Sequence, residues 1–198
     1  MDLNELSAVP SASLPVQELA DHLRLGSGFT DDGSEDTVLE AYLRAALSAV
    51  ESRTGKAVFT RRFSWTLYSW NCPDRQGLPI APVALIESVT LTTSSGSPTV
   101  VDPAQYRLIP DSNRPVLRSN AGLLPNIPND GSVTLIFEAG FGPAWDDIPA
   151  GIQQAIKMLA AIYFDYRHGV ISRNESIPLG IEALLQPHMH MRLSGRLR

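Results

Sequence analysis

The fold of this chain is decided by a stretch near its C-terminus. It reads Ile148-Pro149-Ala150-Gly151-Ile152-Gln153-Gln154-Ala155-Ile156 and continues to Tyr163-Phe164-Asp165-Tyr166-Arg167-His168-Gly169. Apolar side chains recur there at helical spacing, which predicts one long amphipathic helix, capped by Asp147 and ended by Gly169. A further helix is expected over residues 178–186, because Pro187 cannot continue the backbone hydrogen bonding. Two such helices favour a protein that is built to pack and assemble.

Two more helices are expected in the N-terminal quarter of the chain. Pro15 suits the first turn of a helix that Gly26 and Gly28 would stop. The next helix begins at a cap formed by Ser34 or Asp36 and ends at Gly55. The expected helical core consists of the apolar stripes of this helix and of the long C-terminal one: Leu39, Tyr42, Leu43, Ala46, Val50, Ile152, Ile156, Leu159, Tyr163 and Tyr166.

Between the helices the hydrophobic period changes from helical to alternating. From Phe59 to Ser69 every second residue is apolar or aromatic apart from Arg61 and Ser69, which predicts a strand with one buried face. Further short strands are expected at residues 86–93, 99–101, 106–109, 116–118 and 132–137. They should pair antiparallel, since no crossover helix lies between them.

The sequence therefore predicts an α+β fold, a helical core of about four helices interrupted by an inserted antiparallel β-sheet or small sandwich. The expected parts are a flexible arm (1–13), N-terminal helices (14–56), the β insertion (57–142), C-terminal helices that complete the helical core (143–186) and a basic docking tail (187–198).

Charge and composition exclude several classes of protein. The net charge is −5, which argues against nucleic-acid binding by bulk electrostatics. The single cysteine, Cys72, excludes an internal disulfide and a cysteine zinc cluster. No signal peptide and no membrane-spanning run are expected. The last eleven residues are basic, which is typical of a solvated end or of a peg that docks onto an acidic partner.

No cluster of residues has the pattern of a catalytic or metal site. His188 and His190 lack a third ligand, and Asp146-Asp147 is expected to be a cap and a solvated loop. The acidic residues 31–36 lack the ligand spacing of a calcium loop. The aromatic side chains Phe59, Phe63, Trp65, Tyr68 and Trp70 are interpreted as core rather than as base-stacking groups. We therefore expect no enzyme, no cofactor and no metal.

Pieces of sequence that follow one another in a characteristic order span nearly the whole chain from Leu14 to about Arg192. They are residues 14–25, the acidic loop with 40–47, 50–55, 63–70, 78–83 with 86–90, 133–142, 148–167 and 177–185. Their order and spacing resemble the head–tail connector (adaptor) proteins of tailed bacteriophages and phage-derived gene transfer agents. Residues 26–34 form a longer loop than is usual in that family, and residues 107–130 carry little of its pattern.

The resemblance implies a structural role in the neck of a phage-like particle, with the chain made in the bacterial cytoplasm. It implies a ring, typically of twelve copies, between the portal protein and the next neck, stopper or tail-terminator protein. Double-stranded DNA would pass through the ring without sequence-specific binding, and no membrane would be involved. The C-terminal segment of the family docks onto the portal, and the candidates here are His188, His190, Arg192, Arg196 and Arg198.

Two other functions remain open on the residues alone. One is a monomeric, β-containing module that binds proteins or peptides and has no role in a particle. The other is a hydrolase that uses Asp146, Asp147 and the two histidines.

Overall fold

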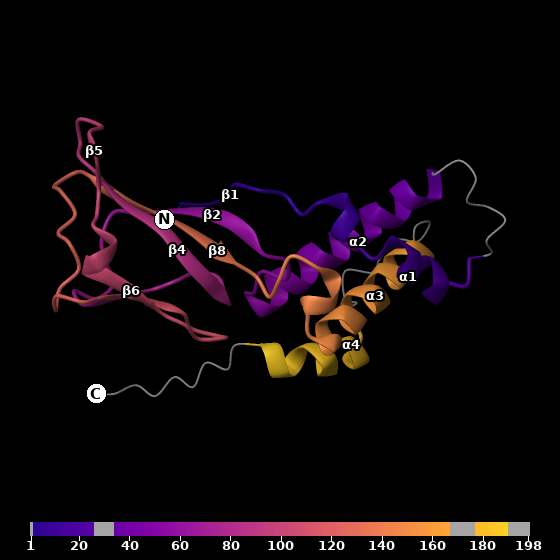
Figure 1. The fold of residues 1–198 in the computed structure, drawn as a ribbon. Coiled ribbons are helices and arrows are strands. Elements are labelled where there is room, and N and C mark those ends of the chain that lie inside the picture. The colour runs from indigo at the N-terminus through magenta and orange to yellow at the C-terminus, as the bar shows by residue number, and fades with distance from the viewer. Residues whose placement is uncertain (1, 26–33, 167–176, 190–198) are drawn as a thin grey trace. The chain divides into compact units, whose positions relative to one another are not determined.

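The structure, a computed structural model, describes residues 2–25, 34–166 and 177–189. The chain divides into two compact units. The first, here called the β unit, consists of Met1–Val9 and Lys56–Pro143, and the second, the helical unit, consists of Pro10–Gly55 and Ala144–Arg198. Most of their strands and all four α-helices of the described residues are labelled in Figure 1, and together they confirm the expected α+β fold.

A five-stranded antiparallel sheet forms one layer of the β unit. Its strand order is β1-β2-β8-β4-β5. The strands are β1 (Asp2–Glu5), β2 (Arg61–Leu67), β8 (Ser132–Ala139), β4 (Val83–Thr92) and β5 (Pro98–Val100). Burial alternates along β2 and β8, as the period of two predicts, so Phe63 and Trp65 lie opposite Phe137 and Leu135 on the buried face.

A three-stranded antiparallel sheet with the order β3-β7-β6 forms the second layer. Its strands are β3 (Arg75–Gly77), β7 (Val116–Ser119) and β6 (Tyr106–Ile109), with the 3₁₀ turn η2 (Pro103–Gln105) before β6. Inward side chains of both sheets, among them Trp65, Leu135, Tyr106 and Leu117, belong to one hydrophobic core. The insertion is therefore a small sandwich.

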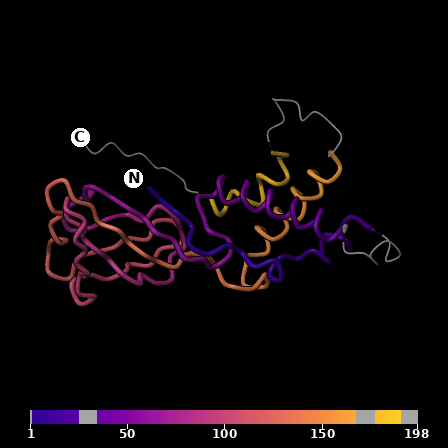
Figure 2. Tube along the Cα trace, turned by 90° about the horizontal axis from the view of Figure 1, so that it is seen from above, coloured from indigo at the N-terminus to yellow at the C-terminus, as the bar shows by residue number. Residues whose placement is uncertain are grey.

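The described residues of the helical unit form four α-helices and three 3₁₀ turns. They are η1 (Ser11–Ser13), α1 (Val16–His22), α2 (Ser34–Thr54), η3 (Trp145–Asp147), α3 (Ala150–Asp165), α4 (Leu179–Leu185) and η4 (Gln186–His188). Helices α2 and α3 lie side by side, and α4 packs against α3 (Figure 2). None of the helices in the described ranges combines the length and the apolar character needed to cross a bilayer.

The N-terminal residues differ from the flexible arm that was expected over 1–13. Asp2–Glu5 form β1, which pairs with β2 from Asp2 opposite Thr66 to Glu5 opposite Phe63. The carboxylate of Glu5 also accepts a hydrogen bond of 2.8 Å from the buried Arg61 guanidinium. The sequence did not predict this strand because its polar residues have low β propensity. The segment is ordered by its pairing with the edge of β2.

The ends of two helices also differ from expectation. Helix α1 ends at His22, before the glycines that were expected to stop it, and Arg24 takes the left-handed conformation (φ 55°). Gly26 and Gly28 lie outside the described residues. Asp147 does not cap α3, because the N-cap of that helix is Pro149. The Asp147 carboxylate instead accepts a hydrogen bond from the Ala144 N–H (3.0 Å).

The C-terminal end of α3 also precedes the expected stop. The helix ends at Asp165 with Tyr166 as its C-cap. Gly169, which was expected to end it, lies outside the described residues.

The aromatic cluster divides between core and surface. Phe59, Phe63 and Trp65 are buried, as predicted. Tyr68 is 68% exposed, and Trp70 is half-buried with its indole N–H donating to the Pro125 carbonyl (2.8 Å). The prediction that all five residues form one buried face is therefore wrong for Tyr68.

Candidate functional site

The apolar stripes of α2 and α3 are buried within the helical unit itself. Most of the expected core residues are almost inaccessible: Leu39, Leu43, Ala46, Val50, Ile152, Ile156 and Leu159. Tyr42 and Tyr163 are half-buried, and the Tyr42 ring meets Phe164 edge to face with a centroid distance of 6.0 Å. Tyr166 is 49% exposed and is not a core residue. Because these stripes cover each other, they are not available for contacts with another protein.

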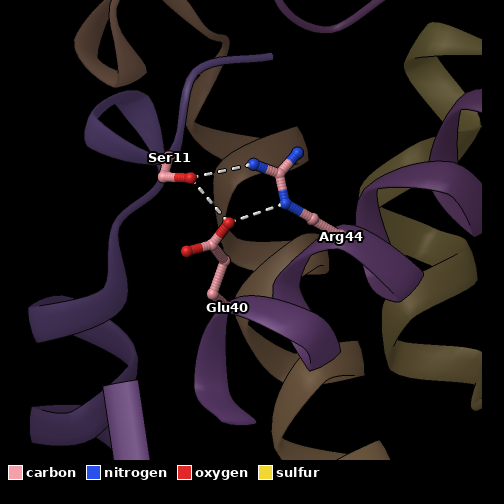
Figure 3. A network of polar contacts seen from close by, with 3 residues as sticks. All are labelled: Ser11, Glu40 and Arg44. Carbon is pink, nitrogen blue, oxygen red and sulfur yellow. Dashed lines mark hydrogen bonds and ion pairs between the residues drawn. The ribbon is translucent and has the colours of Figure 1, made fainter. Parts of the chain in front are cut away.

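A polar network fixes the entry of the chain into the helical unit (Figure 3). The Ser11 hydroxyl and the Arg44 guanidinium both donate hydrogen bonds of 2.8 Å to one carboxylate oxygen of Glu40, and Arg44 also donates to Ser11 (3.2 Å). The bond from Ser11, and after it the bond from Arg44, holds the pKa of Glu40 below its ordinary value. Through the Ser11 hydroxyl the network joins η1 to Glu40 and Arg44 of α2.

Two further ion pairs link helices across the same unit. The Glu18 carboxylate of α1 accepts hydrogen bonds from Lys157 of α3 (2.9 Å) and from the Trp145 indole (3.3 Å). Arg53 near the end of α2 pairs with Glu182 of α4. These contacts link α1 to α3 and α2 to α4.

In the β unit a buried lysine holds a loop in place. The ammonium of Lys56 donates to the Ser112 carbonyl and to the Asn113 side chain (2.8 Å). Burial lowers the pKa of Lys56, and the nearby Asp111 opposes that shift. The backbone N–H groups of Arg114 and Asn113 in turn lower the pKa of Asp111. The contacts of Lys56 and Asp111 therefore stabilise the loop over residues 111–114.

Among the described residues that sequence reasoning considered for chemistry, none is found in a metal-binding group. Cys72 is half-buried, and the Asp147 carboxylate is occupied by the Ala144 N–H. Within residues 2–25, 34–166 and 177–189, no group of three or more His, Cys, Asp or Glu side chains could hold a metal ion.

Of the residues proposed to dock onto a portal, the structure describes His188 alone. It lies at the end of η4, half-buried, and a Cβ placed on Gly151 at the start of α3 would lie 3.7 Å from its Nε2. His190, Arg192, Arg196 and Arg198 lie outside the described residues. The docking role of the tail therefore remains a proposal.

A comparison with solved structures identifies close relatives over nearly the whole chain. The neck of an empty gene transfer agent (GTA) particle, computed with C6 symmetry, contains a chain that is 44% identical with a TM-score of 0.90. The virion of a native GTA particle contains one at 44% identity and a TM-score of 0.87. The neck of a native GTA particle, computed with C12 symmetry, contains a chain that is 40% identical with a TM-score of 0.85. Each match covers 98% of both chains.

No protein-family model and no curated protein sequence matched the chain. The structural matches nevertheless exceed what a shared fold alone produces, because four in ten residues are identical along the full length. They agree with the order of sequence pieces that resembled the connector family. The chain therefore belongs to the family of neck (connector) proteins found in gene transfer agent particles.

Proposed function

We propose that this chain is a structural, non-catalytic subunit of a ring in the neck of a phage-like particle. The ring, typically twelvefold, lies between the portal and the next neck or stopper protein, and DNA passes through its centre. The observation that carries the proposal is the full-length similarity, at 40–44% identity, to chains in GTA necks computed with C12 and C6 symmetry. A ring of twelve copies satisfies both symmetries.

The electrostatics of the chain are compatible with DNA passage. The net charge of −5 gives a ring of such subunits a net negative field. That field repels DNA phosphates over the screening length of about 8–10 Å at physiological salt, and adhesion would require the opposite sign. A duplex would then slide through the ring without being held.

The rigidity of the helical unit supports the structural role. Its apolar stripes are buried against each other, and ion pairs of Glu18 with Lys157 and of Arg53 with Glu182 link α1 to α3 and α2 to α4. A structural subunit that is held between two neighbouring proteins needs a well-packed core of this kind. The basic tail, residues 187–198, is then available to dock onto the portal.

Deleting residues 187–198 is expected to leave a folded chain that no longer binds the portal protein. The deletion begins after Leu185, whose side chain is fully buried, so the core of the helical unit is retained. Binding is measured by pull-down and sedimentation with purified portal protein, and folding by circular dichroism.

A matched variant separates charge from length in the same experiment. It keeps the full chain and replaces His190, Arg192, Arg196 and Arg198 with Ala. If docking is electrostatic, this variant loses portal binding as the deletion does. Portal binding at wild-type affinity by the deletion variant would contradict the docking role of the tail.

A further inference from the structure

Three arginines form a row across the outer face of the three-stranded sheet. The strand register sets Arg75 of β3 opposite Arg118 of β7, and Arg118 opposite Arg107 of β6. All three are exposed, whereas their neighbours Gln76 and Leu117 point into the core and are buried. Adjacent strands lie about 4.8 Å apart, so the row spans about 10 Å.

This row costs stability in the isolated chain. Like charges directly opposite each other in an antiparallel pair repel, and the repulsion occurs here at two successive pairings. Among the described residues, no carboxylate forms an ion pair with any of the three guanidinium groups. Arg107 donates only to the neutral amide oxygen of Asn120 (2.5 Å). Contacts within the described residues therefore do not explain the row of arginines. An anionic partner would explain it, because its charge would offset the repulsion between the guanidinium groups.

An apolar row lies beside the arginines on the same face. The strand register pairs Val116 of β7 with Gly77 of β3 on one side and with Ile109 of β6 on the other. On its strand, each of these residues lies two positions from the arginine of the row. Ile109 is 36% exposed, and a Cβ added to Gly77 would meet nothing within 4 Å, so this part of the face is uncovered. Arginine beside aliphatic surface is typical of protein interfaces. A phosphate backbone would gain nothing from the apolar row.

The helical unit carries the complementary surface. A concavity of about 170 Å³ between α1 and α2 is lined by the carboxylates of Asp21, Glu35 and Asp36 and by the apolar side chains of Ala20, Leu25 and Leu39. Within the described residues no lysine or arginine forms an ion pair with these three carboxylates. Residues 10–55 contain eight acidic and three basic side chains, so the surplus negative charge of the chain is concentrated there.

We propose that the arginine face, defined as Arg75, Arg107, Arg118 with Gly77, Val116 and Ile109, docks onto the acidic concavity of a second copy of the chain. Each copy carries one surface of each sign, so the contact is head-to-tail, the type of contact that builds a ring when its rotation closes. Guanidinium groups bind carboxylates through paired hydrogen bonds, and the apolar residues on both sides are covered at the same time. The inference rests on the proposed ring and names the contact that closes it.

The test uses two charge-reversed forms of the full-length chain. One carries Arg75→Glu, Arg107→Glu and Arg118→Glu, and the other carries Asp21→Lys, Glu35→Lys and Asp36→Lys. Sedimentation equilibrium in 50 mM and 500 mM NaCl measures self-association of the wild type, of each form alone and of their equimolar mixture. Circular dichroism melts establish that each form is folded, and Arg118→Gln with Asp36→Asn provides a milder pair if a triple variant does not fold.

Each reversed form alone should associate at least about tenfold more weakly than the wild type in low salt. The mixture should regain association, because the native and the swapped charge pairs then alternate around the ring. High salt should weaken the wild type and the mixture together. Equal sedimentation of the wild type and both forms would overturn the proposal, as would a mixture no stronger than its components.

Two further outcomes separate this contact from other roles. If the arginine variant self-associates normally but loses binding to a labelled 30-base-pair duplex, the row contacts DNA and the proposal is overturned. If the wild type self-associates as described but builds no ring on a portal, the pairing of surfaces stands and the proposed function fails.

Discussion

Replacing Phe137 with Ala is expected to lower the free energy of unfolding of the β unit by about 3–5 kcal/mol. Phe137 lies on β8, which pairs with β2 on one side and β4 on the other, and its side chain is fully buried. Its ring stacks on Phe63 of β2 with a centroid distance of 5.8 Å and an interplanar angle of 23°. The substitution removes that contact and leaves a cavity between both layers of the sandwich.

Urea denaturation followed by tryptophan fluorescence measures this loss, since Trp65 lies in the same core. Tyr68→Ala is the matched control, because that ring is 68% exposed and its removal should change stability by less than about 0.5 kcal/mol. A loss below about 1 kcal/mol for Phe137→Ala would mean that the two sheets do not share the core described above.

Replacing Gly140 with Ala is expected to cost at least about 3 kcal/mol, for two separate reasons. The φ angle of Gly140 is +140°, which side-chain-bearing residues rarely adopt. A Cβ there would also lie 2.3 Å from the Phe59 carbonyl oxygen, which is backbone and cannot move aside without disturbing its neighbours. The bond from the Gly140 N–H to Pro82 (2.9 Å) would be disturbed as well.

Gly96→Ala isolates the first of these reasons. Gly96 has a φ of +85° in the turn between β4 and β5, but a Cβ there would meet nothing within 4 Å. Its replacement should cost only the backbone strain, about 1–2 kcal/mol. Thermal unfolding of both variants measures the difference. Equal destabilisation would contradict the close approach of Gly140 to Phe59.

The elements that sequence predicted best are those whose signal is local. The alternation from Phe59 to Leu67 and the stripe from Leu39 to Val50 each reflect one buried face, and both appear in the structure. β1 could not be predicted, since Asp2, Asn4 and Glu5 are polar and the segment becomes a strand only when β2 offers an edge. Asp147 was misassigned because a carboxylate before a helix can reach back to an earlier N–H as easily as forward.

The assembly surfaces were the least accessible to sequence reasoning. The helical stripes form the core between α2 and α3, as expected, so they offer no face to a neighbouring copy. Arg75, Arg107 and Arg118 are far apart in the chain, and only the register of β3, β7 and β6 aligns them. Knowing that register in advance would require the turn lengths and bulges that set it.

The central claim is that this chain is a ring-forming subunit of a phage-like neck. Cryo-electron microscopy of particles purified with the chain tests it most directly. The account predicts one layer of symmetry-related copies, twelve around the axis, beside the portal and around an open channel. Particles complete without this chain, or a chain that stays monomeric and never joins a particle, would contradict it.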